Sequence, residues 1–393
     1  MAFSPMAFRT CFKESLKLGL TSFGGPVAHL AYFREAYVER LQWLSDEKFA
    51  ELLALCQFIP GPASSQLGAA IGYEKGGWLG GVGAWLGFTL PSAILMILFV
   101  TTLNILNDWA LSGAIQGLTF VAVAVVANAV IGMQRKLCPN AKGIFIALLV
   151  AAILFAFQSP SIQPLLILIG GILGAGLFRK DVQTDILKSE QTLNHPIGAL
   201  AILGVFILGV LILSSVQPNS DEMTTIFGLT KTGSMVFGGG HVVLPLLEAE
   251  TVAKGVMSRD EFLAGYGFAQ AMPGPMFSFG AYVGALVGLG GNPWVGGPLG
   301  VVLIFLPGMI LLSIGMPIWN AYKQVNIIRA SLRGASAAVV GLILAALIHM
   351  LRSGVINTLI EACMVVGLAV IVYKKIVPVW AVVLSGVGIG FLV

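Results

Sequence analysis

The stretch that decides the fold reads Gln57-Phe58-Ile59-Pro60-Gly61-Pro62-Ala63-Ser64-Ser65-Gln66, and the chain contains it twice. The second copy reads Gln270-Ala271-Met272-Pro273-Gly274-Pro275-Met276-Phe277-Ser278. A continuous helix cannot cross either copy, since two prolines around a glycine remove amide donors and clash with the preceding turn. A membrane tolerates such a break only where the backbone is buried in protein or lines a polar cavity. Two breaks at corresponding positions of two halves therefore predict a transport site.

Composition places the chain in a membrane. It has 393 residues, of which 57% are hydrophobic and only 10% charged, and its mean hydropathy is +0.92. Soluble proteins carry roughly 25% charged residues. Uncharged runs such as 78–106 and 262–322 are long enough for one or two membrane-spanning helices each. We therefore expect an all-α polytopic protein whose surroundings are the lipid bilayer, and the net charge of +4 indicates no nucleic-acid partner.

The two breaks belong to a larger internal repeat. Phe23-Gly24-Gly25 recurs as Phe237-Gly238-Gly239 at an offset of 214 (237 − 23), and the same offset carries Lys17 onto Lys231. Further landmarks follow in the same order: Gln57 and Pro60-Gly61-Pro62 recur as Gln270 and Pro273-Gly274-Pro275 at 213 (270 − 57), and Trp78 and Pro91 recur as Trp294 and Pro307 at 216 (294 − 78). We predict two homologous halves, 1–178 and 224–393, joined by 179–223.

The helices expected within each half follow from the apolar runs. In the first half they are 9–22, a broken region 26–73, then 78–106, 110–134, 143–158 and 161–178. In the second half they are 224–236, a broken region 240–289, then 294–317, 328–350, 354–373 and 376–392. One extra apolar helix, 196–215, has no partner in the repeat, which gives about 13 spans if both broken regions count as spanning.

An odd helix between the halves should reverse the second half in the membrane, and the basic loops agree. In the first half 135–142 and 179–194 carry lysines and arginines, whereas 107–109 and 158–164 carry none. In the second half the counterparts of the empty loops are the basic ones, with Lys323, Arg329, Arg333, Lys374 and Lys375. Because cytoplasmic loops are enriched in Lys and Arg, we expect inverted-topology repeats with the N-terminus inside and the C-terminus outside.

The two breaks are candidate anion sites. A helix that restarts at Pro62 or Pro275 would present unpaired amide groups and roughly half a positive charge. The first half would supply the amides of Ala63, Ser64 and Ser65, and the second those of Met276, Phe277 and Ser278. The side chains of Ser64, Ser65, Gln66 and Ser278 could add donors, and Gln57 and Gln270 flank the breaks. The alternative is that each Pro-Gly-Pro merely kinks a packed helix.

Charged residues inside apolar helices are the next candidates. Lys17 and Lys231 fall at one repeat position, where either a site role or snorkelling to the interface would explain them. His29 and Glu35 follow the first Phe-Gly-Gly, and His241 and Glu248 the second, as candidate proton carriers or as ordinary helix-surface pairs. Glu361 is a lone acid within 354–373 and a candidate coupling residue.

No pattern indicates an enzyme, a metal or a cofactor. The chain has no HExxH, no P-loop and no nucleotide fingerprint in a strand–helix context. Its four histidines are widely spaced, and Cys11, Cys56, Cys138 and Cys363 form neither a zinc pattern nor a disulfide framework.

The motifs resemble those of the chromate ion transporter family. Phe23-Gly24-Gly25-Pro26-Val27-Ala28-His29-Leu30, Trp43-Leu44-Ser45-Asp46 and the first Pro-Gly-Pro stretch resemble its N-terminal signature. Phe237-Gly238-Gly239-Gly240-His241-Val242-Val243-Leu244-Pro245 and the second Pro-Gly-Pro are similar to its C-terminal one. The likeness runs along both halves, as in the long-chain, two-domain form. It implies efflux of chromate across the bacterial inner membrane and hence chromate resistance.

The expected mechanism is alternating access around 60–66 and 273–278. Chromate is a tetrahedral dianion isosteric with sulfate, so sulfate or another oxyanion is an alternative substrate. A passive anion channel with the same broken helices and an intramembrane chromate reductase are further alternatives. The sequence leaves open the coupling ion and the choice between a monomer and a homodimer.

Overall fold

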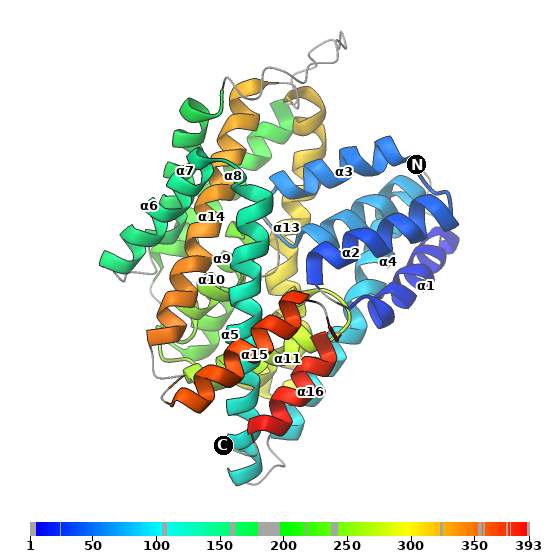
Figure 1. Cartoon of the computed structure of the whole chain (residues 1–393). Coiled ribbons are helices and arrows are strands. Elements are labelled where there is room, and N and C mark those ends of the chain that lie inside the picture. Colours follow the sequence, from blue (N-terminus) through cyan, green and yellow to red (C-terminus); the bar gives the residue numbers. More distant parts are fainter. Residues whose placement is uncertain are drawn as a thin grey trace.

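The computed structural model describes residues 5–23, 25–103, 108–157, 162–179, 197–216, 218–236, 243–322, 325–352, 356, 358–374, 376–377 and 379–390. Throughout these parts every regular element is a helix, as expected from the sequence. In Figure 1, α1 to α4 gather on one side and α6, α7 and α14 on the other, with α8 and α13 between them.

The helices of the first half follow the predicted runs. They are α1 (Pro5–Thr21), α2 (Gly25–Phe33), the π-helix η1 (Arg34–Arg40), α3 (Asp46–Phe58), α4 (Ala63–Leu103), α5 (Asp108–Leu137), α6 (Ala141–Phe157) and α7 (Gln163–Leu177). The predicted broken region 26–73 thus consists of α2, η1, α3 and the first part of α4. The extra helix is α8 (Ile197–Ser215).

The second half repeats this order. Its helices are α9 (Asp221–Met235), α10 (Val243–Glu250), α11 (Arg259–Ala271), the 3-10 turn η5 (Met276–Ser278), α12 (Phe279–Val287), the 3-10 turn η6 (Leu289–Gly291), α13 (Pro293–Tyr322), α14 (Asn326–Arg352), α15 (Leu359–Lys374) and α16 (Val379–Gly390). The broken region 240–289 contains α10, α11, η5 and α12.

Both predicted breaks are present and have the same backbone shape. The helix before each break begins at a serine whose side chain caps it, Ser45 for α3 and Ser258 for α11. Each ends at an extended residue, Ile59 (φ −83°, ψ 138°) or Met272 (φ −83°, ψ 150°), because the proline that follows disfavours a helical conformation there.

The small changes in repeat offset have local structural causes. The offset falls from 214 to 213 between Arg40 and Ser45, in the turn that follows η1. It rises from 213 to 216 where the second half carries the three residues of η6 before α13. In the first half the same bend is a non-helical pair, Gly76 and Gly77, which divides α4 into two helical segments.

Pairs of small residues interlock the two halves. On α7, Gly170 and Gly174 pack against Gly334 of α14, which belongs to the other half. On α16, Gly386 and Gly390 pack against α5 at Gly117. Both pairs have the small-xxx-small spacing that lets membrane helices approach closely. The last helix of each half is therefore held by a helix of the other half.

The membrane assignment rests on long apolar helices. Four stretches are long and apolar enough to cross a bilayer, namely Ala63–Thr102, Gln116–Arg135, Pro293–Trp319 and Asn326–Arg352, and six described apolar helices are shorter. The extra helix α8 packs on α13 and α9 and exposes most of its apolar residues. The number of spans and the inverted orientation remain predictions.

We predict that Gly174→Leu weakens the packing of α7 on α14. A Cβ at Gly174 would lie 2.5 Å from the carbonyl oxygen of Ala330, so the helices must separate, at a cost of about 1–3 kcal/mol. Gly176→Leu on the same helix is the matched control, because a Cβ there meets open space. The apparent melting temperature in detergent should fall for the first variant only. An equal fall in both would show that the glycine contact is not needed.

Candidate functional site

The Pro-Gly-Pro break of each half bonds to the backbone of the other half. The amide of Gly61 donates to the carbonyl oxygen of Val236 (2.6 Å), and the amide of Gly274 donates to that of Ser22 (3.0 Å). Ser22 and Val236 directly precede the two Phe-Gly-Gly motifs and occupy one repeat position (236 − 22 = 214). Each break therefore contacts the opposite half at the interface between the halves instead of facing lipid.

A second pair of contacts adjoins the first. The side-chain amide of Gln66 donates to the carbonyl oxygens of Gly308 (2.8 Å) and Pro60 (2.9 Å). The hydroxyls of Ser92 and Ser278 lie 2.6 Å apart. Ser92 and Gly308 share a repeat position (308 − 92 = 216), each directly after the proline of a long helix. We call this region, defined by Ser22, Gly61, Gln66, Ser92, Val236, Gly274, Ser278 and Gly308, the central crossing.

The crossing requires glycine in both breaks. Gly61 has φ +130° and Gly274 φ +95°, which L-residues rarely adopt. A Cβ on Gly61 would lie 2.9 Å from the Cα of Gly308, and one on Gly274 would lie 2.9 Å from the hydroxyl of Ser92. Gly61 and Gly274 therefore permit this close backbone approach both by their conformation and by their lack of a side chain.

Several buried polar groups around the crossing have no hydrogen-bond partner within the described protein. They are the hydroxyls of Ser22, Ser65, Thr89 and Thr232, the side-chain oxygen of Gln66 and both ring nitrogens of His29. An unpaired buried polar group costs about 1–3 kcal/mol, so such groups are normally paired. Their concentration here indicates a place built to receive water or a polar ligand.

His29 is fully buried, as are Ser22 and Gln66. Its exposed fraction is 0%, and its ring lies edge-on to Phe88 at 5.2 Å between centroids. It is close to the Ser22 backbone, yet neither ring nitrogen has a hydrogen bond of good geometry. The backbone of Phe88 also borders Gly274, which places His29 at the first-half side of the central crossing.

The start of α4 presents amides as predicted, although Pro62 does not begin the helix. The first helical bond runs from the amide of Gln66 to the carbonyl of Pro62 (2.9 Å), so Pro62 is the capping residue and Ala63 begins the helix. The amides of Ala63, Ser64 and Ser65 lie outside the helical bonds. Ser64 and Ser65 are both buried.

Pro275, like Pro62, does not begin a helix, and the second break also differs in the hydrogen bond of its Ser278 amide. Pro275 precedes η5, which is a 3-10 turn, and the amide of Ser278 donates to the carbonyl of Pro275 (2.9 Å). The expectation that Pro275 opens the helix with a free Ser278 amide is therefore wrong, because the tighter turn uses that amide. Met276 also accepts a contact at its sulfur from the side-chain amide of Gln270 (3.6 Å).

The two halves are unequally equipped with polar groups. Ser65 and Ser278 keep a hydroxyl at one repeat position. Thr232 of the second half corresponds to the apolar Leu18. At five other positions a polar residue of the first half corresponds to an apolar or smaller residue of the second: Ser22 to Val236, His29 to Val243, Gln66 to Phe279, Thr89 to Phe305 and Ser92 to Gly308. The candidate site therefore draws most of its donors from the first half.

The remaining predicted motif residues are only partly described. Phe23 is half-buried, Gly25 begins α2 with φ +76°, and Gln57 lies half-buried near the end of α3. Gly24, Gly238, Gly239, Gly240 and His241 lie outside the described residues.

Lys17 and Lys231 each pair with a carboxylate, but the two carboxylates lie on helices that are not counterparts in the repeat. Lys17 pairs with Glu14 (2.6 Å) on its own helix, and Lys231 pairs with Glu250 of α10. The second-half counterpart of Glu14 is Gly228, and a Cβ there would lie 2.8 Å from the Cβ of Glu250. The missing side chain thus makes room for the relocated carboxylate.

A second cation completes each cluster. Arg40 pairs with Glu14 at 3.3 Å, and Lys254, 214 residues later (254 − 40), pairs with Glu250 at 2.5 Å. Each half thus keeps two cations and one anion in contact. This arrangement places Lys17 and Lys231 in ion clusters and not among the buried hydroxyls of the crossing.

The candidate coupling acids also have local explanations. Glu361 accepts from the backbone amide of Thr358 (3.0 Å) while the Thr358 hydroxyl caps α15, and it also contacts Gln116. Glu35 lies on the exposed side of η1. Proton coupling through these acids stays a prediction.

Glu248 belongs to an ion pair that recurs with reversed charges. It pairs with Arg259 at 3.4 Å, and its counterpart Arg34 pairs with Asp46 at 2.8 Å. The offsets match, 214 for Arg34 (248 − 34) and 213 for Asp46 (259 − 46). The pair joins corresponding helices in both halves, so the contact is kept although both signs have changed.

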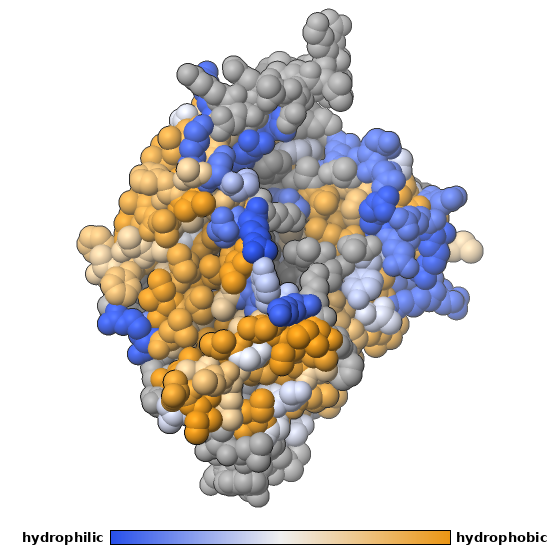
Figure 2. All heavy atoms as spheres, in the orientation of Figure 1, coloured by the Kyte–Doolittle hydropathy of each residue, from blue (hydrophilic) through white to orange (hydrophobic). Residues whose placement is uncertain are grey.

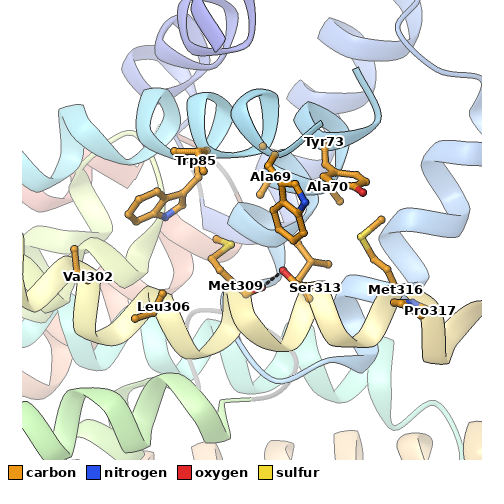
Figure 3. Close-up of a pocket in the computed structure, with 14 residues that line it drawn as sticks. Ala69, Ala70, Tyr73, Trp85, Val302, Leu306, Met309, Ser313, Met316 and Pro317 are labelled. Carbon is orange, nitrogen blue, oxygen red and sulfur yellow. Dashed lines mark hydrogen bonds between the residues drawn. The ribbon is translucent and has the colours of Figure 1, made fainter. Parts of the chain in front are cut away.

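An apolar cavity of about 650 Å³ lies between α4 and α13. Trp85, Tyr73 and Ala69 reach into it from α4, and Leu306 and Met309 from α13 (Figure 3). Its lining is mostly aromatic and aliphatic, which would penalise an unpaired anion. The cavity is therefore not the predicted anion site.

A comparison with known families matches two stretches of this chain, 9–175 and 223–391, to the chromate transporter family. Together they cover most of the sequence, one match in each predicted half. The chain belongs to the chromate transporter family. No solved structure gives a significant match.

Relatives of this family member include proteins named for chromate transport. A chromate transport protein of Pseudomonas aeruginosa is 28% identical over 86% of this chain and 80% of its own length. One from Cupriavidus metallidurans is 25% identical over 87% of this chain and 82% of its own length. An uncharacterised transporter of Methanocaldococcus jannaschii is 28% identical over 97% of this chain and 93% of its own length.

We predict that Gly61→Ala abolishes ion transport by this family member, because the variant combines a forbidden φ with a clash against Gly308. Gly255→Ala is the control: Gly255 has φ +76° but open space around it, so only backbone strain of about 1–2 kcal/mol applies. Ion uptake into membrane vesicles and the apparent melting temperature are measured for both variants. Normal uptake by Gly61→Ala would contradict the tight crossing.

The reversed ion pair gives a separate prediction. Glu248→Arg places two cations together in a largely buried site and should lower the apparent melting temperature. Adding Arg259→Glu restores the pair with the signs found in the first half and should recover most of the loss. A double variant as unstable as the single one would show that the contact does not tolerate exchange.

Proposed function

We propose that the protein exports chromate, or a similar tetrahedral oxyanion, from the cytoplasm by alternating access around the central crossing. The observation that carries the proposal is the reciprocal bonding of the two Pro-Gly-Pro breaks, with unpaired buried donors gathered beside them. Family membership and relatives named for chromate transport support the substrate class. The cytoplasmic membrane is the site that such efflux requires.

The donors suit an oxyanion in number and kind. A tetrahedral dianion offers four oxygens that accept hydrogen bonds, and the hydroxyls of Ser22, Ser65 and Thr89 can each donate one. The amides of α4 from Ala63 onward add donors and the positive end of a long helix. The ring of His29 supplies one more N–H in its neutral form and two when protonated.

The ion clusters contribute the long-range field. Each consists of two cations and one carboxylate, so each carries a net charge of +1. A positive field beside a site of neutral donors attracts a dianion without holding it in a direct salt bridge. Release is then not blocked by a strong local pair.

The membrane potential is sufficient to drive export. An interior-negative potential favours outward movement of negative charge by about 2.3 kcal/mol per charge per 100 mV, so a dianion gains about 4–5 kcal/mol. Export therefore needs no partner ion, although proton coupling through His29 would add to the driving force.

Uptake of chromate into inside-out membrane vesicles tests the proposal. Ser65→Ala removes one hydroxyl donor to a charged ligand, worth about 1.5–3 kcal/mol, and should raise the apparent KM by about tenfold or more. Ser385→Ala on α16 is the control, because its exposed hydroxyl bonds only to the Ala381 carbonyl of its own helix. An unchanged KM for Ser65→Ala would remove this residue from the site.

The same assay separates the alternative functions. Competition by an equal concentration of sulfate would identify a general oxyanion carrier, whereas its absence would indicate selectivity for chromate. Flux that rises without saturation would indicate a channel. No uptake of either anion by the wild-type protein would overturn the proposed function.

A further inference from the structure

The two halves differ in how their third helix docks. In the second half α11 packs closely against α5 and α16. Its counterpart α3 would reach the equivalent surface on α14 and α7, but within the described residues its main contacts are η1, α4 and α13. Within the described residues, the second half thus makes an extensive contact between α11 and α5, and the first half makes no equivalent contact between α3 and α14.

Another contact of these helices is kept in both halves, that of α11 with α4 and of α3 with α13. Phe268 of α11 stacks on Phe99 of α4 at 4.1 Å between ring centroids. The equivalent residues are Leu55 of α3 and Gly315 of α13, where the Leu55 Cδ1 lies 3.9 Å from the position of a Cβ on Gly315. This contact is kept in both halves, whereas the contacts of α11 with α5 and α16 have no counterpart of similar extent in α3 within the described residues.

The docked contact depends on a small residue. A Cβ on Gly267 of α11 would lie 2.5 Å from the carbonyl oxygen of Leu118 on α5. The residue of α3 that corresponds to Gly267 is Ala54 (267 − 54 = 213). With the offset of 217 that relates Gly117 to Gly334 (334 − 117), the residue of α14 that corresponds to Leu118 is Ala335. Alanine at both positions allows the same close approach if α3 moves onto α14.

Solvent exposure follows the same asymmetry. The side chains of the reversed ion pair are 46% and 57% exposed for Arg34 and Asp46, but only 13% and 21% exposed for Glu248 and Arg259. Figure 2 shows hydrophilic side chains gathered over the side formed by α1 and α3. The ion pair of the first half is therefore exposed at the surface, whereas its second-half counterpart is mostly covered.

We infer that water reaches the central crossing past α3 while α3 is undocked from α14, and that docking of α3 on α14, with release of α11 from α5, is the transport step. The inference rests on the proposed function and names the route that it uses. Because the halves are homologous, the contact that forms between α3 and α14 would resemble the contact that is lost between α11 and α5. Two such states can lie within a few kcal/mol of each other.

Disulfide trapping tests the route in full-length protein. The test variant is Ala54→Cys with Ala335→Cys, and the control is Gly171→Cys with Ala335→Cys. The control positions, on α7 and α14, already have Cβ atoms 4.0 Å apart, which suits a disulfide. The background replaces the native cysteines, Cys11, Cys56, Cys138 and Cys363.

The control should cross-link without affecting transport, because the glycine pairs of α7 and α14 stay together throughout. The test pair should cross-link in membranes, and the bond should reduce chromate uptake by about tenfold or more until dithiothreitol restores it. A test pair that never cross-links in transporting protein, or that cross-links fully without loss of uptake, would overturn the route.

The two failures remain distinguishable. Cross-linking is read from protein mobility on a gel and needs no substrate, so the route can be judged even if chromate is not transported. Conversely, if the reduced variants and the control take up chromate while the test pair fails to cross-link, the function stands and the route falls.

Discussion

A backbone amide that leaves a helix inside a membrane must find another acceptor, and the rest of this structure depends on where the two broken helices find theirs. Gly61 and Gly274 each donate to a carbonyl of the opposite half. Each break is thus satisfied by the opposite half, and this exchange interlocks the repeats. The glycine contacts of α7 with α14 and of α16 with α5 extend the same exchange to the outer helices.

Residues that pack the helices together are kept in both halves, whereas most polar residues at the central crossing differ between the halves. The packing glycines, the capping serines and the ion pairs are kept at matching positions, even where a carboxylate has moved from Glu14 to Glu250 or where both signs of a pair are reversed. Apart from the hydroxyls of Ser65 and Ser278, most polar groups at the crossing are not kept: His29 corresponds to Val243 and Thr89 to Phe305. Two homologous halves thus give an asymmetric candidate site, in which most of the unpaired buried polar groups belong to the first half.

Much of this could be predicted from sequence, because prolines act locally. The breaks, the duplication, the helix ranges and the burial of Ser64, Ser65 and Gln66 follow from Pro-Gly-Pro and the apolar runs. The reciprocal bonding could not be predicted, since a break satisfied within its own half has the same sequence. Ser22, Thr89 and Thr232 were missed because a serine or threonine in an apolar helix usually bonds the carbonyl four residues back, as Thr251 does. Only packing shows which hydroxyls lack that bond.

The central claim is that an oxyanion binds at the central crossing, against the start of α4. Anomalous scattering from chromium in crystals grown with chromate locates the anion directly. The account predicts a single peak within hydrogen-bond reach of the Ser65 hydroxyl and close to His29. A peak at the ion clusters of Lys17 or Lys231 alone, or no ordered peak at saturating chromate, would contradict it.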